Sequence, residues 1–383
     1  MSVRITGTGL APFIVDAADL VEGPHGGLVP HRLTARARTQ VNDLLFRWVE
    51  GNAAGVRVLA ATDADALTVT VHGTSIAMPG GEPGIPNLVV RVHPRSGVAD
   101  PLAASARVID IATFDVLAVD TVSLRIDRIE GESCTFTADL PAGGATVEVL
   151  LPHGAPLEIV ALEADRPVEP GVDARPRWLH HGSSISHSTN APDPSRTIPQ
   201  QVADAWNVRL RNLAFGGNAQ ADQFTARMIR DTPADLITLC IGVNLVNADS
   251  MRERTFLPAL HGFLDTVRDG HPTTPLVLIG AIICPIHEDT PGPVIDDGGT
   301  MRPSRRDVEK DEGALTVSRA RQIAYEVAQA RMAEDPHLSW VDGLEFFGAD
   351  DAPLLTDRLH PSPGGNDLIS ERILSRWGRF PIG

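Results

Sequence analysis

Four short segments of the sequence carry the residue types that acyl transfer requires. In chain order they are residues 182–185 (GSSI), 212–218 (NLAFGGN), 242–244 (GVN) and 357–361 (DRLHP). A serine hydroxyl becomes an effective nucleophile when a histidine accepts its proton, and a carboxylate orients and stabilises that histidine. Backbone N–H groups and an amide side chain can stabilise the oxyanion that forms. The segments supply all of these groups, so they indicate an enzyme that works through an acyl-serine intermediate.

Each segment also has an ordinary structural explanation when it is considered alone. A serine after a glycine is commonly a turn residue, and tandem glycines such as Gly216 and Gly217 commonly form a tight turn. Asn244 fits an Asx turn, and Asp357 with His360 fits a capping pair before the next helix. The catalytic interpretation therefore depends on whether one edge of a sheet collects all four segments.

The later part of the sequence alternates apolar strands with amphipathic helices, which is typical of a parallel sheet covered on both faces. The expected strands are RWLHHGSSI (177–185), NLAFGG (212–217), ADLITLCIGVN (234–244), PLVLIGAIICP (275–285) and LSWVDGLEFFG (338–348). Ligands bind beyond the carboxyl ends of such strands, and the four segments lie at or after these ends. One intervening helix is expected to start with a capping box of Thr197 and Gln200.

The first part of the sequence has the pattern of a different domain. Its short alternating runs are LTVTVHG (67–73), NLVVRVHP (87–94), TVSLRIDRIEG (121–131), SCTFTADLP (133–141) and ATVEVLLPHG (145–154). Period-two alternation between turn residues is typical of half-buried antiparallel strands, and repeated runs favour a β-sandwich. The Pro-rich, charged stretch 164–178 has the composition of a linker. We therefore predict a β-sandwich domain in residues 1–170 and an α/β domain in residues 171–383.

One long segment, residues 285–313, interrupts a crossover of the α/β domain and is rich in proline, glycine and acidic residues. An insertion of this length in a compact domain more often forms a lid or a binding loop than a plain connection, with disorder as the alternative.

Other polar clusters favour neither a metal nor a nucleotide. Histidines near Ser184 and a group of histidine and acidic residues in segment 285–313 lack zinc or calcium spacing, so solvated charge or substrate contact is the better interpretation. These residues are His180, His181, His187, His287, Glu288, Asp289, Asp296 and Asp297. Asp342 is expected to be a helix cap or loop anchor rather than the catalytic acid. The FGGN run (215–218) lacks the glycine spacing and lysine of a nucleotide loop.

The net charge and the cysteine content limit the binding partners and the cellular compartment that we expect. Thirty-three basic and 49 acidic residues give a formal net charge of −16, which disfavours nucleic acid and anionic membranes as partners. Cys134, Cys240 and Cys284 fit neither a disulfide framework nor a Cys-x-x-Cys site, so a reducing cytoplasm is expected. No secretory pattern or bilayer-length apolar run is visible. Lys310 is the one lysine, which leaves arginine as the cation for any substrate phosphate.

The four segments resemble the four characteristic blocks of the SGNH (GDSL) hydrolase family, in the family's order and across residues 175–383. GSSI is similar to the Gly-Asp-Ser-Leu block with Ser183 in place of the aspartate, and Ala214 stands where a glycine is common. The resemblance implies a flavodoxin-like, three-layer α/β/α domain with a parallel sheet. We expect the antiparallel β-sandwich that precedes this domain to be jelly-roll-like.

The same resemblance assigns roles to individual residues. It implies Ser184 as the nucleophile, His360 as the general base and Asp357 as the carboxylate that orients it. It implies an oxyanion hole formed by the backbone N–H groups of Ser184 and Gly217 and by the side chain of Asn244.

The β-rich first domain, the GSSI block and the CPIHEDTPGP run (284–293) make the chain similar to a two-domain subgroup of the family. The subgroup includes GDSL-type acyltransferases of tetracycline tailoring. It implies transfer of a salicylyl-type aryl acyl group to a polyketide hydroxyl, with acyl-CoA as the donor substrate and no required cofactor or metal. An ester hydrolase, such as a carboxylesterase or carbohydrate deacetylase, is the alternative with the same triad. A non-catalytic carbohydrate-binding protein is the alternative of another class, and the oligomeric state stays open.

Overall fold

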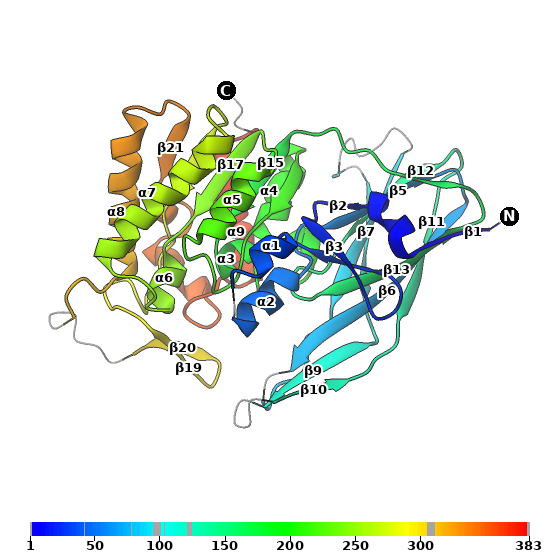
Figure 1. Ribbon diagram of the computed structural model, residues 1–383, viewed down its shortest axis with the longest axis horizontal. Helices are drawn as coiled ribbons and strands as arrows, with labels where there is room; N and C mark the ends of the chain where they lie inside the picture. The colour runs from blue at the N-terminus through cyan, green and yellow to red at the C-terminus, as the bar shows by residue number, and fades with distance from the viewer. Residues whose placement is uncertain are drawn as a thin grey trace. The chain divides into compact units, whose positions relative to one another are not determined.

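The computed structural model describes residues 2–41, 43–77, 79–94, 101–102, 104–120, 125–304 and 311–380. The chain forms two compact units, whose secondary structure is drawn in Figure 1. The N-terminal unit contains Met1–Arg175 and Asp193–Ser195, and the C-terminal unit contains Pro176–Pro192 and Arg196–Gly383. The stretch 164–178, predicted as a linker, gives a strand to the N-terminal unit, since β14 (Val168–Pro170) pairs with β5 (Arg57–Thr62).

The N-terminal unit contains two β-sheets. The first, in spatial order, is β10 (Arg125–Ile129), β9 (Phe114–Asp120), β6 (Ala66–Ala77), β13 (Leu157–Ala164), β4 (Leu28–His31) and β3 (Asp19–Glu22), with β1 (Val3–Thr6) beside β13 and β11 (Cys134–Asp139) beside β6. The second is β14, β5, β12 (Ala145–Leu150), β7 (Asn87–Pro94) and β8 (Ser105–Asp110), with β2 (Ile14–Val15) beside β5. Short helices α1 (Ala35–Arg38) and α2 (Leu44–Gly51) and the 3₁₀ turn Gly7–Phe13 complete the unit.

Most of the predicted strands of this unit are confirmed. The runs at 67–73, 87–94, 133–141 and 145–154 become β6, β7, β11 and β12. The run 121–131 contains β10 from Arg125, while its residues 121–124 lie outside the described part of the chain. One pairing departs from the predicted antiparallel pattern, because β6 and β9 run parallel.

Both sheets contribute alternate residues to one hydrophobic core. Val69 and Val71 of β6 lie in this core together with Val58 of β5 and Val147 and Val149 of β12. These positions alternate along their strands, so each sheet buries one face against the other. Full burial of each valine stabilises the fold by about 1.5–3 kcal/mol.

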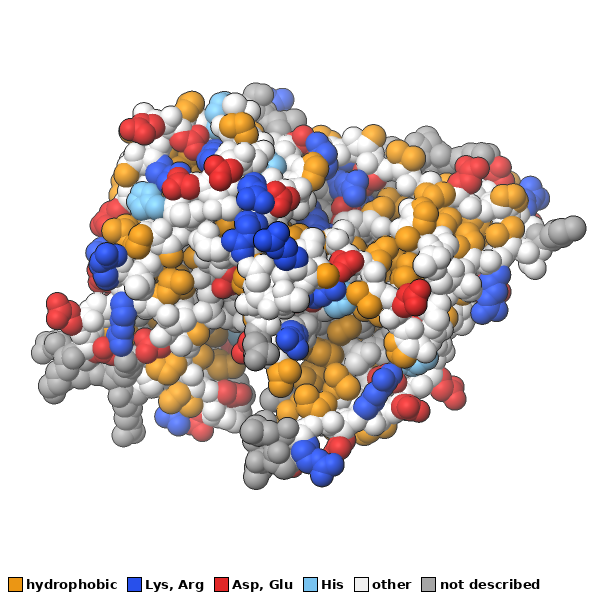
Figure 2. Space-filling model, viewed as in Figure 1, with side chains coloured by type: hydrophobic (Ala, Val, Ile, Leu, Met, Phe, Trp, Pro, Cys, Tyr) orange, Lys and Arg blue, Asp and Glu red, His pale blue; other side chains and the backbone are white. Residues whose placement is uncertain are grey.

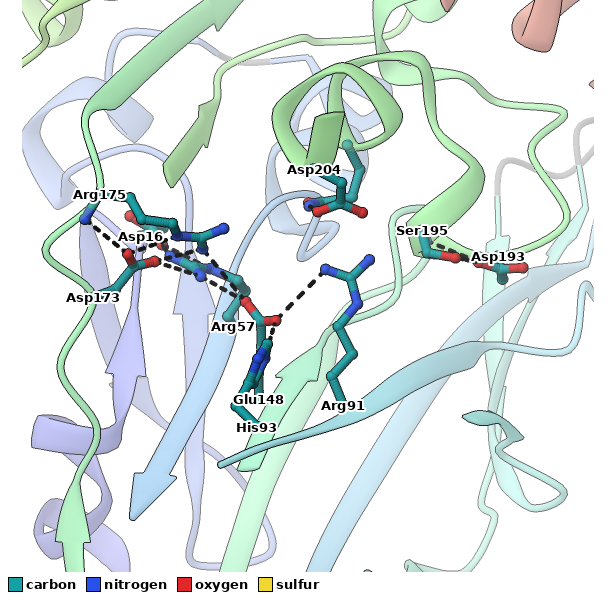
Figure 3. Close-up of polar contacts among 11 residues, drawn as sticks. Asp16, Arg57, Arg91, His93, Glu148, Asp173, Arg175, Asp193, Ser195 and Asp204 are labelled. Atoms are coloured by element: carbon teal, nitrogen blue, oxygen red, sulfur yellow. Dashed lines mark hydrogen bonds and ion pairs between the residues drawn. The ribbon is translucent and has the colours of Figure 1, made fainter. Parts of the chain in front are cut away.

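The opposite face of the second sheet carries charged side chains that are also buried. Glu148 stands between Val147 and Val149, directly opposite Arg91 of β7 in the strand register. Arg57 of β5 contacts Glu148 at 2.6 Å, and its guanidinium also reaches Asp16 at 2.7 Å and Asp173 at 2.8 Å. Figure 3 shows these residues converging from the neighbouring strands β5, β12 and β7 and from the loops that carry Asp16 and Asp173. The predicted half-buried character is therefore wrong for β12, which is buried at every position.

The buried ion pairs set the protonation of this cluster. Burial alone would raise the pKa of Glu148, but its hydrogen bond with His93 and the charges of Arg57, Arg91 and Arg175 hold that pKa well below its ordinary value. Burial alone would raise the pKa of Asp173, but a hydrogen bond from Arg175 stabilises its ionised form. The pKa of Asp173 falls to about 2 as a result. Both carboxylates are therefore ionised at neutral pH.

The C-terminal unit is built on a parallel sheet of five strands. Their spatial order is β16 (Arg209–Asn212), β15 (Arg177–His181), β17 (Leu236–Cys240), β18 (Leu276–Ile279) and β21 (Leu338–Val341). Numbered along the chain, this order is 2-1-3-4-5, which is the flavodoxin-like arrangement that was predicted. Strand β16 ends at Asn212, the residue at which the corresponding predicted strand (212–217) was expected to begin. It ends there because the Asn212 Oδ1 accepts the Ala214 N–H at 2.8 Å and turns the chain.

Two groups of helices cover the sheet, as the three-layer prediction requires. The pair α4 (Ile198–Trp206) and α9 (Pro363–Arg376) pack together, and α7 (Glu253–Gly270) packs against both α5 (Gln223–Asp231) and α8 (Val317–Met332), as Figure 1 shows. Thr197 caps α4 by accepting the Gln200 N–H at 3.4 Å. The reciprocal half of the predicted capping box is wrong, because the Gln200 side chain donates to Asp204 instead.

Across the described residues, no helix is both long enough and apolar enough to cross a membrane.

Candidate active site

Ser184 is the first residue of a short helix, α3 (Ser184–His187), that follows β15. Ser183 caps this helix, since its Oγ accepts the Ile185 N–H at 3.2 Å. The turn requires Gly182, because a Cβ there would lie 2.2 Å from Ser186 Oγ. The N–H of Ser184 has no acceptor within its own helix, as is general for a first helical residue, so it is suited to donate to an oxyanion.

His360 joins the serine to an aspartate through two hydrogen bonds. Its Nε2 lies 2.9 Å from Ser184 Oγ, and its Nδ1 lies 2.6 Å from Asp357 Oδ2. A carboxylate accepts hydrogen bonds, so Nδ1 carries the proton and Nε2 presents its lone pair to the serine hydroxyl. This tautomer is the one that a general base for serine requires.

The loop 357–361 holds the aspartate in place. Asp357 Oδ1 accepts the backbone N–H groups of Leu359 at 3.0 Å and His360 at 2.7 Å, which leaves Oδ2 for the imidazole. Burial alone would raise the pKa of Asp357, but the hydrogen bonds from the His360 ring and from these two N–H groups hold it below its ordinary value. Asp357 is therefore an anion at neutral pH.

Gly217 and Asn244 lie at the carboxyl ends of the two strands that flank β15. Gly217 has φ +72° in the turn after β16, and a Cβ added to the preceding Gly216 would lie 3.4 Å from the Ser184 Cβ. Asn244 lies in α6 (Val243–Asn247), and its Oδ1 accepts the Ala219 N–H at 3.0 Å. Since this contact fixes the oxygen, the Asn244 Nδ2 remains a donor on the other side of the amide.

The topology explains why these groups meet. Strand order reverses between β15 and β17, and α/β sheets bind ligands at such a switch point. Ser184 follows β15, Asn244 follows β17, and the loop of Asp357 and His360 follows β21 at the same edge.

Segment 285–313 forms a β-hairpin that contacts the loop of the aspartate. Its strands are β19 (Val294–Asp297) and β20 (Thr300–Pro303). The alternative of disorder is therefore wrong for these residues. Residues 305–310 lie outside the described part of the chain. The Met301 N–H donates to the Asp357 carbonyl oxygen at 3.2 Å. The hairpin is thereby tied to the loop 357–361, hereafter the triad loop after the triad that the sequence predicts.

The base of the hairpin is fixed by α8. The Arg321 guanidinium binds Glu288 through Nη1 at 2.8 Å and Nη2 at 3.1 Å, and the Val317 N–H donates to the His287 carbonyl at 2.8 Å. Glu288 and His287 therefore anchor the segment, in contrast to the solvated or substrate-contacting role that was expected for them.

Sequence reasoning missed a second tie to the triad loop. Asn190 Nδ2 donates to the Pro361 carbonyl at 3.0 Å, and Thr189 donates to the Ser184 carbonyl through its N–H and its Oγ1, both at 3.3 Å. These contacts join the nucleophile loop to the histidine loop. Neither residue belongs to a periodic pattern or a motif, so the sequence carried no signal for them.

The remaining candidate residues have structural contacts. His180 Nδ1 lies 2.6 Å from Thr238 Oγ1, and burial together with the neighbouring His181 charge lowers the pKa of His180 to about 3. Asp342 caps a 3₁₀ turn by accepting the Leu344 N–H at 3.0 Å, which confirms its predicted role. Within the described ranges, no three or more His, Cys, Asp or Glu side chains are grouped to hold a metal ion.

Two cysteines of this unit are unsuited to nucleophilic chemistry. Burial raises the pKa of Cys240 and of Cys284 to about 12, so both stay as thiols at neutral pH.

The GDSL-like lipase/acylhydrolase family model matches residues 181–368, which include all four segments. This part of the chain is a GDSL-like lipase/acylhydrolase domain. No curated protein sequence matches the chain. The fold of the GDSL domain and of the unit that precedes it recurs in solved structures.

Three such structures align with nearly the whole chain. The salicylyl-acyltransferase SsfX3 from a tetracycline biosynthetic pathway has 23% identity and a TM-score of 0.78, over 100% of this chain and 99% of that one. A candidate GDSL-like lipase from Bacteroides ovatus has 16% identity and a TM-score of 0.62, over 98% and 96%. A family two carbohydrate esterase from Cellvibrio japonicus has 12% identity and a TM-score of 0.57, over 98% and 97%. At these identities, the likeness establishes the fold alone, namely the fold of the GDSL domain together with that of the unit that precedes it.

Proposed function

We propose that this protein is a serine acyltransferase that moves an aryl acyl group from a CoA thioester to a hydroxyl of a polyketide-type acceptor. The observation that carries the proposal is the hydrogen-bonded chain from Ser184 Oγ through His360 to Asp357. A serine hydroxyl that is hydrogen-bonded to an imidazole forms a nucleophile–base pair. The ionised carboxylate holds the imidazole in the tautomer that this pair requires.

In the first half of the reaction, Ser184 Oγ attacks the thioester carbonyl while His360 Nε2 accepts the hydroxyl proton. Negative charge then forms on the carbonyl oxygen, where the N–H groups of Ser184 and Gly217 and the amide of Asn244 stabilise it. The carbon–sulfur bond breaks, and His360 returns the proton to the departing sulfur. Asp357 stabilises the imidazolium that exists between these two proton transfers.

In the second half, the acceptor hydroxyl attacks the acyl-serine ester and gives its proton to His360. The ester bond to Ser184 breaks, and His360 protonates the serine oxygen. The product is an ester of the acceptor, and the enzyme is regenerated. Water in place of the acceptor would give hydrolysis by the same steps, so the outcome depends on access to the acyl-enzyme.

Two features favour transfer over hydrolysis. The β19–β20 hairpin is fixed at its base and tied to the Asp357 carbonyl, which suits a cover that limits water near the acyl-serine. The fold, including the N-terminal unit, matches an enzyme described as a salicylyl-acyltransferase over 100% of this chain and 99% of that one.

Ester hydrolysis is the second candidate, with a carbohydrate ester as its substrate class. The match to a family two carbohydrate esterase over 98% of this chain supports it.

Labelling and product analysis test the proposal. A serine-directed organophosphonate should label the wild type, and Ser184→Ala should abolish labelling and lower turnover by about 10⁴-fold or more. Ser186→Ala, in the same short helix, is the matched control and should keep both. With salicylyl-CoA and a polyketide alcohol, ester product should form. Labelling of Ser184→Ala would overturn the nucleophile, and release of free acid alone would favour the hydrolase.

A further inference from the structure

Arg358 occupies an unusual position between the aspartate and the histidine of the triad. Its backbone has φ +72°, a left-handed conformation that a residue with a Cβ seldom adopts. Its side chain is exposed. A glycine would fit this backbone more easily. A long cationic side chain at this strained position therefore indicates a functional role.

The guanidinium of Arg358 makes no hydrogen bond or ion pair with any described residue. Three other exposed or half-buried arginines of the C-terminal unit have carboxylate partners, at 2.9 Å for Arg302 with Asp297, 2.9 Å for Arg319 with Glu253 and 2.8 Å for Arg252 with Asp311. Arg358 is thus a cation beside the triad that is available to a ligand.

The charge of the whole chain makes such a cation important for an anionic substrate. The net charge is −16, and Figure 2 shows acidic side chains interspersed with basic ones on the face that it draws. A polyanionic donor is therefore repelled by the protein as a whole and needs a local cation at its binding site.

We propose that Arg358 binds a phosphate group of the acyl-CoA donor and thereby determines donor specificity. This inference rests on the proposed transferase function. A guanidinium pairs with phosphate through two parallel hydrogen bonds, which a neutral donor cannot offer. The phosphates of CoA lie at the far end of the pantetheine arm from the thioester. An arginine that starts beside His360 and extends into solvent suits this separation better than a buried one would.

Two donors with the same acyl group test the assignment. Salicylyl-CoA carries the phosphates, whereas the salicylyl thioester of N-acetylcysteamine keeps the reacting bond and lacks them. Steady-state kcat and KM are measured for both donors with wild type, Arg358→Gln, Arg358→Gly and Arg358→Lys. Arg358→Gly suits the left-handed backbone and keeps the test valid if glutamine distorts the loop. Arg230→Gln removes the same charge near the end of α5, at the opposite edge of the sheet, and is the control for net charge.

In Arg358→Gln and Arg358→Gly, KM for salicylyl-CoA should rise about tenfold or more, as expected for loss of a hydrogen bond to a charged group. The kcat for both donors and the KM for the short thioester should stay within about twofold. Arg358→Lys should keep most of the affinity, and Arg230→Gln should resemble the wild type. Added salt should raise the wild-type KM for salicylyl-CoA more than that of Arg358→Gln.

Other results would overturn the assignment in distinguishable ways. An equal loss on both donors would mean that Arg358 shapes the triad loop. A raised KM for the acceptor alone would place the anion on the acceptor. An unchanged KM for salicylyl-CoA in a wild type that uses this donor would reject the contact but keep the transferase. A wild type that uses neither thioester would reject the proposed donor and this inference with it.

Discussion

Asp357 determines which nitrogen of His360 can accept a proton. One of its oxygens is held by two backbone N–H groups, and the other binds His360 Nδ1 at 2.6 Å. Its lowered pKa keeps it ionised throughout the pH range in which an imidazole loses its proton. At this scale the sequence was informative for the contact between Asp357 and His360, because the Asp-x-x-His spacing is itself the hydrogen-bonding unit. It was uninformative for Asn190, whose contact with Pro361 depends on how two distant loops meet, and for Thr189, whose contact with the Ser184 carbonyl belongs to no sequence motif.

Asp357→Asn should preserve the loop and lower kcat by about 10⁴-fold, because an amide N–H directed at Nδ1 favours the tautomer whose Nε2 already carries a proton. The measurement is acyl-enzyme formation from an activated ester in stopped flow, with the fold checked by circular dichroism. Asp342→Asn, which alters the aspartate directly after β21, is the control and should stay near wild-type activity. Near-normal acylation in Asp357→Asn would remove Asp357 from the mechanism.

The β19–β20 hairpin contacts the loop 357–361, and the sequence did not predict its strands. Apolar runs predicted the five parallel strands because buried strands need continuous hydrophobic sequence. The hairpin strands, VIDD and TMRP, are short and largely exposed, so they lack such a pattern. Their one signal was the Gly298-Gly299 pair, which adopts φ +64° and +85° and suits a two-residue hairpin turn.

Met301→Pro should raise the ratio of hydrolysis to transfer several-fold. Proline removes the N–H that binds the Asp357 carbonyl, and a strand tolerates proline where its N–H points out of the ladder. A hairpin released from the triad loop admits more water to the acyl-serine. The ratio of free acid to ester product is read by chromatography. Met301→Ala keeps the N–H and should behave as wild type; an unchanged ratio in Met301→Pro would mean that the tie does not control water access.

The whole molecule combines a C-terminal unit, in which the contacts among Ser184, His360 and Asp357 were expected from the sequence, with an N-terminal unit whose buried charges were not. Alternation in the run 145–154 predicted a half-buried strand, but the Glu148 side chain on its polar face is 1% exposed and lies among arginines. The sequence could not reveal this, because strand pairing and loop packing bring to Arg57 three carboxylates that lie 41, 91 and 116 positions away from it along the chain. A period-two pattern distinguishes the two faces of a strand, and it does not say whether the polar face is covered.

Glu148→Gln should destabilise the protein by about 3–5 kcal/mol at pH 7, because it leaves buried guanidinium groups without their central carboxylate. The pKa of Glu148 is depressed on folding, so its contribution is present above the pKa of an unfolded glutamate and is lost as the pH falls. The stability gap between wild type and variant should therefore shrink in acid. Calorimetry between about pH 7 and pH 3 measures this gap.

Asp367→Asn is the matched control, since it breaks an exposed pair at 2.7 Å with Arg196. It should cost about 1 kcal/mol or less. Equal losses in the two variants would show that the buried cluster contributes no more than a surface pair.

The contact between Ser184 and His360 joins residues that are 176 positions apart. During synthesis the serine leaves the ribosome long before the histidine does, so a nascent chain carries the proposed nucleophile without its proposed base until the loop that precedes α9 has emerged. The proposed acyl transfer therefore cannot begin while most of residues 181–368 are being made. Recovery of acylation after dilution from denaturant would time the arrival of this loop, separately from the formation of secondary structure.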